Sequence, residues 1–233
     1  EQATLGDIVP LARKLSSSTA IAARQDASEK GQTVPCCKGC DSCCSSLIPM
    51  SVPEVFRMNE EFMAMPREMS NALLRKCIKA ATRILEKTHQ SDYLKNFARI
   101  SKSGIGQINK WYGTLGLECP FLENSLCSIY DQRPMACREH IVLGSPQPCR
   151  RESLCRPKVV PMKVSILEAL GQLASELEQT EVEAIILPFS VAWAQDNLER
   201  AARKWPTVEM VRRFEEILHD KTGKRESVLA ASN

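Results

Sequence analysis

The sequence predicts a mainly α-helical protein whose helices form a shell around irregular, cysteine-rich loops. Apolar residues recur at helical spacing through both the N-terminal and the C-terminal third of the 233-residue chain. Between these parts, most of the eleven cysteines gather in two turn-rich stretches, residues 36–44 (the first cluster) and 119–140 (the second cluster). Only residues 182–187 resemble a β-strand, and one short strand has no evident partner.

The N-terminal segment is expected to begin with two helices. Residues 1–30 carry apolar side chains at helical spacing, and Gly31 is a suitable helix stop. After the first cluster, Ser51 and Glu54 stand at the spacing of a capping box, in which each side chain bonds the other residue's backbone N–H. A helix is therefore expected to start at Ser51.

Pro66 marks the start of a longer helix that runs to about residue 88. Cys77 lies on its apolar side, so we interpret Cys77 as a core thiol rather than a ligand. Residues 90–116 are interrupted by glycines and give a weak helical signal, with short helical pieces possible at 93–100 and 108–112, so a loop or lid is expected there. Trp111 and Tyr112 could cover the metal site, but we favour plain core packing for them.

The C-terminal third is helical again. Residues 165–179 and 190–205 carry apolar residues at helical spacing, and Thr207 can cap a last helix. We expect residues 1–160 to form a metal-binding, cysteine-cluster domain with its N-terminal helices. Residues 161–233 are expected to be a helical segment packed on it in one compact unit.

Composition and charge exclude several classes of protein. Hydrophobic residues make up 43% of the chain and charged residues 25%, as in ordinary globular proteins. No apolar run approaches the roughly 20 residues that span a bilayer, so no membrane association is expected. A net charge of +3 does not indicate nucleic-acid binding. The N-terminus lacks the pattern of a signal peptide, so a cytoplasmic location is expected.

The cysteines indicate metal binding rather than disulfides. In a reducing cytosol thiols stay reduced, and clustered thiols there typically bind metal. The odd count of eleven would also leave one thiol unpaired in a disulfide framework. Adjacent pairs such as Cys36-Cys37 and Cys43-Cys44 cannot form ordinary disulfides without strain.

The spacing of the first cluster favours an iron–sulfur cluster. Cys37, Cys40 and Cys43 repeat the C-x-x-C-x-x-C run that supplies three ligands to a [4Fe–4S] cluster in bacterial ferredoxins. A distant cysteine that precedes a proline supplies the fourth ligand in such proteins, and Cys119-Pro120 matches that element. Both clusters are therefore expected to close on one [4Fe–4S] centre.

Zinc is the alternative, because paired C-x-x-C hooks are typical of tetrahedral zinc sites and two such sites could share these thiols. Cys36, Cys149 and Cys155 are additional candidate ligands. His140 follows Cys137 at C-x-x-H spacing and is a further candidate, although we favour a supporting or surface role for it.

Cationic residues crowd the second cluster and the segment after it: Arg133, Arg138, Arg150, Arg151, Arg156 and Lys158. We favour the interpretation that they offset the charge of several thiolates. A binding site for an anionic substrate is the alternative. Arg133 is expected to bond a carboxylate or a carbonyl beside a cysteine sulfur and so to hold the second cluster, and Arg138 to act beside it.

The motifs C-x-x-C-x-x-C-C at 37–44, Cys119-Pro120-Phe121-Leu122 and the run from Cys127 to Arg138 resemble the YkgJ-type cysteine-cluster family, which is described as zinc- or iron-chelating. The resemblance covers roughly residues 30 to 145. It implies a metal centre and leaves the reaction open. The family pattern falls on seven cysteines: Cys37, Cys40, Cys43, Cys44, Cys119, Cys127 and Cys137. Cys36, Cys149 and Cys155 lie outside it.

Three functions compete at this point. The first, which we favour, is a metal protein whose iron–sulfur cluster has a redox or enzymatic role. The second follows from the relation of the family to the flagellin lysine methylases, which implies a protein-lysine methyltransferase-like enzyme that uses S-adenosylmethionine and acts on a protein substrate. The third is an interaction module in which zinc is purely structural. The sequence alone assigns no reaction.

Overall fold

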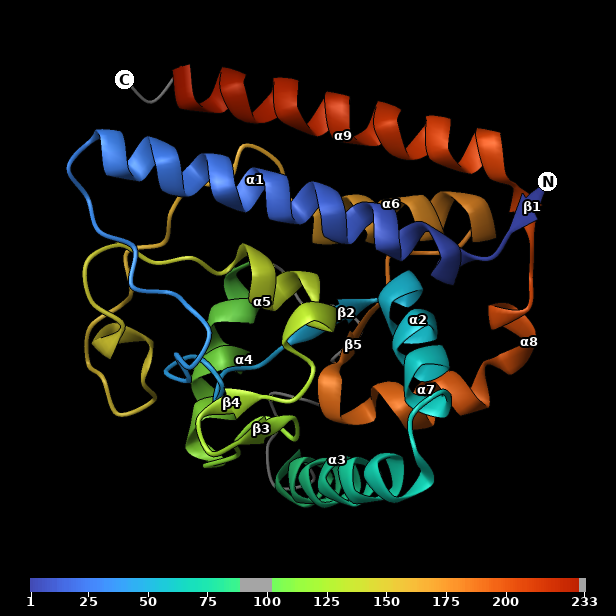
Figure 1. Cartoon of the computed structure of the whole chain (residues 1–233), viewed down its shortest axis with the longest axis horizontal. Coiled ribbons are helices and arrows are strands. Elements are labelled where there is room, and N and C mark those ends of the chain that lie inside the picture. The colour runs from blue at the N-terminus through green and yellow to red at the C-terminus, as the bar shows by residue number, and fades with distance from the viewer. Residues whose placement is uncertain (89–101, 231–233) are drawn as a thin grey trace.

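The computed structural model describes residues 1–88 and 102–230, and it confirms a mainly helical architecture (Figure 1). The α-helices are α1 (Val9–Glu29), α2 (Val52–Met63), α3 (Arg67–Thr88), α4 (Lys102–Thr114), α5 (Met135–Glu139), α6 (Ile166–Glu178), α7 (Ser190–Asp196), α8 (Leu198–Ala201) and α9 (Thr207–Ala230). Short 3₁₀ turns stand at η1 (Leu5–Ile8), η4 (Tyr130–Gln132), η5 (Gln147–Cys149) and η6 (Leu187–Phe189).

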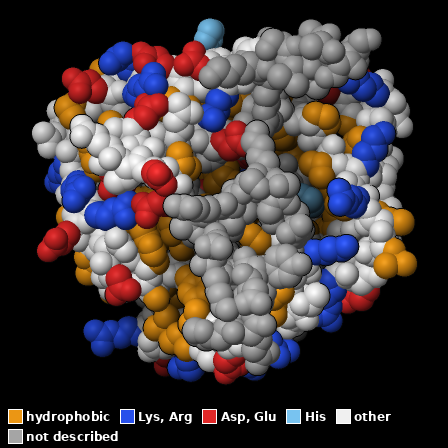
Figure 2. Space-filling view, turned by 180° about the vertical axis from the view of Figure 1, so that it is seen from behind, with side chains coloured by type: hydrophobic (Ala, Val, Ile, Leu, Met, Phe, Trp, Pro, Cys, Tyr) orange, Lys and Arg blue, Asp and Glu red, His pale blue; other side chains and the backbone are white. Residues whose placement is uncertain are grey.

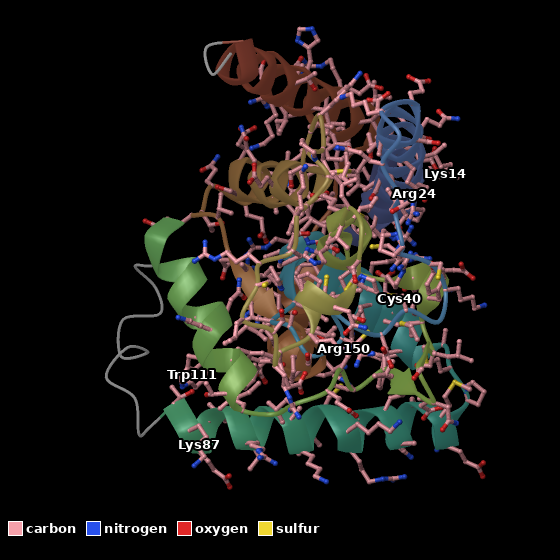
Figure 3. The ribbon with its side chains drawn as sticks, turned by 90° about the vertical axis from the view of Figure 1, so that its left-hand side faces the viewer. Lys14, Arg24, Cys40, Lys87, Trp111 and Arg150 are labelled. Atoms are coloured by element: carbon pink, nitrogen blue, oxygen red, sulfur yellow. The ribbon has the colours of Figure 1, made fainter. Side chains whose placement is uncertain are left out.

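Helix α6 is the centre of the core. It packs against α9, which lies above it in Figures 1 and 3, and also against α1, α2 and α5. The Ser165 hydroxyl caps its start by accepting a hydrogen bond from the Glu168 backbone N–H at 3.2 Å. Leu170 and Leu173 on this helix have no exposed surface, as expected for a helix that is covered on most sides.

Two predicted helices are shorter than expected. Residues 1–30 do not form one helix, because the Asp7 carboxylate accepts from the Thr4 backbone N–H at 2.8 Å and closes a separate η1 turn before α1. Residues 190–205 divide into α7 and α8, because Asn197 leaves the helical region with φ −123°. The predicted helix after Ser51 is confirmed as α2, with its capping box.

The strands form three antiparallel pairs: β1 (Gln2–Ala3) with β6 (Trp205–Pro206), β2 (Pro49–Ser51) with β5 (Ala184–Ile186), and β3 (Leu122–Glu123) with β4 (Leu126–Cys127). The expectation that the strand at 182–187 has no partner is therefore wrong. Its partner β2 is only three residues long and directly precedes α2. The pair fastens the end of the first cluster to the C-terminal third.

Residues 102–114 form the helix α4 and not the expected loop. The rest of the expected loop, from residue 90 to 101, lies outside the described residues. Tyr112 and Leu115 are buried against Ile84 of α3, which is the packing role that was expected of Tyr112. This contact stabilises the segment despite its glycines, each of which costs about 1 kcal/mol in a helix.

The main core extends into both cysteine clusters. Phe121 and Met135 from the second cluster and Ile48 beside the first are buried in the same apolar core as α2 and α6. Cys77 of α3 is buried there as well, which confirms the interpretation of Cys77 as a core thiol. Packing against the core therefore fixes the position of both cysteine loops.

The surface shows mixed charge. On the face in Figure 2, Lys and Arg side chains alternate with Asp and Glu side chains, in agreement with a net charge of only +3. None of the helices in the described ranges combines the length and the apolar content that a bilayer span requires.

Candidate metal centre

The first cluster is a chain of tight turns. The Cys40 N–H donates to the Cys37 carbonyl at 3.1 Å, and the Cys44 N–H donates to the Asp41 carbonyl at 2.8 Å. Gly39 occupies the left-handed region at φ +92°, which disfavours a residue with a side chain. The backbone of the C-x-x-C repeats thus makes one tight turn after another.

The second cluster begins with a hairpin. Strands β3 and β4 are joined by Asn124 and Ser125, both at positive φ, as a tight two-residue hairpin turn requires. The hairpin folds Cys127 back toward Cys119, and the Ser128 N–H donates to the Phe121 carbonyl at 2.8 Å. The η4 turn and α5 then carry the chain to Cys137.

Hydrogen bonds join the two clusters directly. The Cys119 N–H donates to the Cys44 carbonyl at 2.7 Å. At the rim, the Ser125 hydroxyl donates to the Asp41 carboxylate at 2.6 Å. Segments that are separated by about 75 residues in sequence therefore lie side by side in the fold.

Between the clusters lies a cavity of about 60 Å³, which we call the thiol cavity. Six cysteines line it: Cys40, Cys43, Cys44, Cys119, Cys127 and Cys137. Ile48, Phe121 and Leu187 close its apolar sides. The structure thus brings together six of the seven cysteines in the family pattern, from both clusters.

Cys37, the remaining cysteine of that pattern, does not line the thiol cavity. It is exposed and lies at a second, adjoining cavity of about 200 Å³. We call this the arginine cavity; it is lined by Ser16, Ser17, Ala20, Ile21, Arg24, Cys36, Cys37, Cys40, Cys43, Tyr130, Arg133, Cys137, Arg138, His140 and Ile141. Cys40, Cys43 and Cys137 line both cavities, so the two spaces adjoin.

The additional candidate ligands are placed apart from the thiol cavity. The Cys36 sulfur accepts a hydrogen bond from the Val142 N–H at 3.4 Å, and the Cys149 sulfur lies 3.8 Å from Nε2 of His140. Burial lowers the pKa of His140, so its imidazole is neutral at pH 7. Cys155 is exposed and lines neither cavity.

The thiols of the thiol cavity differ in acidity. The Cys44 thiol donates a hydrogen bond to the Cys43 sulfur, which lowers the pKa of Cys43 to about 7 and raises the pKa of Cys44. Burial raises the pKa of Cys119 to about 12 and raises that of Cys137 as well. Of these four thiols, Cys43 ionises most readily near neutral pH, and a metal ion must displace protons from Cys44, Cys119 and Cys137.

Arg133 supplies positive charge beside these thiols. Its guanidinium stacks on the Tyr130 ring at 3.7 Å, and its Nε donates to the Tyr130 carbonyl at 2.9 Å. Its charge helps to lower the pKa of Cys43 and opposes part of the rise that burial causes in the pKa of Cys127. Arg138 in turn donates from Nε to the Arg133 carbonyl at 3.0 Å. Contacts with Tyr130 thus hold Arg133 within the second cluster.

The donor set suits a soft metal. None of the described residues that line the thiol cavity is a carboxylate, and thiolates favour zinc or iron–sulfur centres over magnesium or calcium. Yet across residues 1–88 and 102–230, no three Cys, His, Asp or Glu side chains are already arranged to hold one metal ion. The thiols surround the cavity without converging on a single point.

Two carboxylates hold the ends of α5 through contacts that no sequence pattern indicates. Besides capping α2, Glu54 accepts a hydrogen bond from the Met135 N–H at 2.6 Å, at the first residue of α5. At the other end of α5, Glu139 accepts from the Ser165 hydroxyl at 2.8 Å and from the Leu167 N–H at 2.9 Å. Helix α5, which carries Cys137, is thus held at both ends.

Comparison with known proteins identifies one family. A family model named CxxCxxCC and described as “Putative zinc- or iron-chelating domain” matches residues 36–156, just over half of the chain. The matched range contains all eleven cysteines. No curated protein and no solved structure matches the chain.

Proposed function

Because the chain belongs to the CxxCxxCC family of zinc- or iron-chelating domains, we propose that its thiol cavity holds a metal centre bound by both cysteine clusters. The observation that carries this proposal is that six thiols, from two distant parts of the chain, line one cavity. Metal bound there would hold the two clusters together. It would therefore stabilise the fold as well as supply reactivity.

The ligands come first from the cysteines that interact most closely. Cys43, Cys44, Cys119 and Cys137 influence one another's ionisation, and Cys127 lies beside them. Cys40, at the border of the arginine cavity, is the sixth candidate. Cys37 would join only if its exposed side chain turned inward, so we rank it below these six.

An iron–sulfur cluster is the centre we favour. Sulfur ligands of one tetrahedral zinc ion, each about 2.3 Å from the metal, must converge on a point, whereas ligands at the corners of a cluster stand further apart. The described thiols surround the cavity without such convergence. When bound, an iron–sulfur cluster supplies one-electron transfer.

The protein's own contribution is to tune and shield the site. Ile48, Phe121 and Leu187 limit water access on the apolar sides. Arg133 and the backbone N–H groups near the sulfurs stabilise negative charge. Apolar burial and positive charge act on a reduction potential in opposite directions, so Arg133 offsets part of the effect of burial.

A single zinc ion is the second candidate, on a specific observation. The thiol cavity, at about 60 Å³, is much smaller than the arginine cavity, at about 200 Å³. A single ion needs less of this space than an eight-atom cluster does. In that case the metal is structural and holds the fold together.

Anaerobic purification followed by iron, zinc and acid-labile sulfide analysis tests the proposal. We expect iron and sulfide in equal amounts, with visible absorption that is lost on oxidation. Stoichiometric zinc without sulfide would instead establish the second candidate. Cys155→Ala serves as a control that retains metal, because Cys155 is exposed and outside both cavities. Protein that contains neither metal after anaerobic purification and reconstitution would contradict the proposal.

A further inference from the structure

The arginine cavity has a wall that the metal centre does not account for. One face of α1 contributes five of its lining residues, spaced one helical turn apart: Ser16, Ser17, Ala20, Ile21 and Arg24. Figure 3 shows Arg24 on α1 above the loop that carries Cys40. The opposite wall is formed by parts of both cysteine clusters. The cavity therefore lies between α1 and the proposed centre.

A buried hydroxyl on this wall has no partner. Ser16 has no exposed surface, and its Oγ makes no hydrogen bond to any described residue. Its neighbours Ser17 and Thr19 donate to carbonyls four residues earlier on the helix, at 2.9 and 3.1 Å. A buried hydroxyl without a partner costs free energy, and a hydrogen bond to a ligand would recover it once the Ser16 side chain turned toward the cavity.

The polar wall is cationic. Arg24, Arg133 and Arg138 line the cavity, and none of the described lining residues is acidic. Their observed partners are neutral: Arg24 donates to the Cys36 carbonyl at 2.7 Å, and Arg138 donates to the Ser17 hydroxyl at 3.2 Å. Guanidinium groups of this kind recognise carboxylate or phosphate groups through paired hydrogen bonds.

Neutralising the nearby thiolates is one reason for the arginine side chains in this wall, but it does not explain why the cavity is open. The cavity has a volume of about 200 Å³, against about 60 Å³ for the thiol cavity, so it has room for a small organic molecule. Its apolar lining, from Ala20, Ile21 and Ile141, suits a short aliphatic body better than an inorganic ion. A ligand with one anionic end and a small apolar part matches both kinds of wall.

We propose that the arginine cavity binds a small organic acid, whose carboxylate accepts hydrogen bonds from Arg24, Arg138 and Ser16. Its aliphatic part lies against Ala20 and Ile141. The proposal goes beyond the metal centre and does not require it. Because Cys40, Cys43 and Cys137 line both cavities, the bound acid would lie directly beside the centre.

Isothermal titration of the 233-residue chain with butyrate tests the proposal, because butyrate joins one carboxylate to a short aliphatic chain. We expect saturable one-to-one binding of butyrate. Butyramide, which has nearly the same shape but no charge, is expected to bind at least tenfold more weakly. Inorganic phosphate is the second arm. Tighter binding of phosphate than of butyrate would overturn the assignment to an organic acid.

Variants connect the binding to the cavity. Ser16→Ala is expected to weaken butyrate binding about tenfold while leaving the melting temperature equal or higher, because it removes a hydroxyl without a partner and favours the helix. If Ser16 had only a structural role, its substitution would change the melting temperature and the butyrate affinity together. Arg24→Met is expected to weaken binding at least tenfold.

Arg150→Met is the matched control, because Arg150 is exposed and does not line the cavity. It should leave the dissociation constant unchanged. Absence of butyrate binding, or equal loss in Arg150→Met and Arg24→Met, would overturn the proposal. The titration is carried out on metal-loaded and metal-free protein. Because metal content is measured separately, failure of the metal proposal and failure of this one are distinguishable.

Discussion

Oε1 of Glu54 accepts a hydrogen bond of 2.6 Å from the backbone N–H of Met135, across 81 residues of sequence. Glu54 is almost fully buried, and its other oxygen caps α2 through Ser51. One carboxylate thus joins the helix that follows the first cluster to the helix that carries Cys137. Burial raises the pKa of Glu54, while the bonds from Met135 and Ser51 favour the charged form.

Substitution of Glu54 tests this link. Glu54→Gln replaces one acceptor oxygen by an amide donor, which then faces a backbone N–H. We expect the free energy of unfolding to fall by about 2–4 kcal/mol and the metal content to fall with it, as measured by denaturant titration and elemental analysis. Glu60→Gln on the same helix is the control, because Glu60 is half exposed. Its stability should change by less than about 0.5 kcal/mol. Equal effects of the two substitutions would contradict the link.

Cysteine substitutions distinguish the two cavities. Cys119→Ala and Cys137→Ala remove deeply placed thiols of the thiol cavity, and each should lower the metal content at least fivefold. Cys155→Ala should leave the metal content unchanged, because Cys155 lines neither cavity. Elemental analysis of the purified variants measures this. A loss of metal in Cys155→Ala equal to that in Cys119→Ala would contradict the assignment.

Metal affinity should rise with pH. The pKa values of Cys44, Cys119 and Cys137 are raised, that of Cys119 to about 12, so these thiols carry protons at pH 7 in the metal-free chain. Because metal binds the thiolate, each displaced proton adds about a factor of ten in affinity per pH unit. Three such protons predict a rise of about a thousandfold per unit above pH 7. Competition with a chromophoric zinc chelator between pH 6 and 8.5 measures it, and an affinity that stays constant would contradict this prediction.

The Cys43–Cys44 pair makes a prediction for the metal-free protein. The hydrogen bond from the Cys44 thiol lowers the pKa of Cys43 to about 7. Alkylation of Cys43 by iodoacetamide should therefore show a midpoint near pH 7, followed by mass spectrometry of the labelled peptide. Cys44→Ala should move the midpoint toward the ordinary thiol value near 9. An unchanged midpoint in this variant would mean that Arg133, and not Cys44, sets the acidity.

Local patterns predicted the elements whose causes are local. The capping box at Ser51 and Glu54 marked the start of α2, and the apolar spacing after Pro66 marked α3. The spacing of the cysteines predicted that both clusters supply thiols to one place, and six of the seven family cysteines do line one cavity. The identity and the spacing of the cysteines are enough to predict this shared location.

Features that depend on distant contacts were missed. Strand β2 is three residues long, and only its pairing with β5, about 135 residues later, makes it a strand. Helix α4 contains glycines that favour a loop, and burial of Tyr112 against α3 outweighs them. Cys37 is exposed, and no spacing rule indicates this position.

The most direct test of the central claim is an anomalous diffraction map of crystals of the metal-loaded protein. The account predicts one metal peak, or one compact group of peaks, between Cys43 and Cys44 on one side and Cys119 and Cys137 on the other. Ligands should come from both cysteine clusters. Metal bound by the first cluster alone, or metal located outside the thiol cavity, would contradict the account.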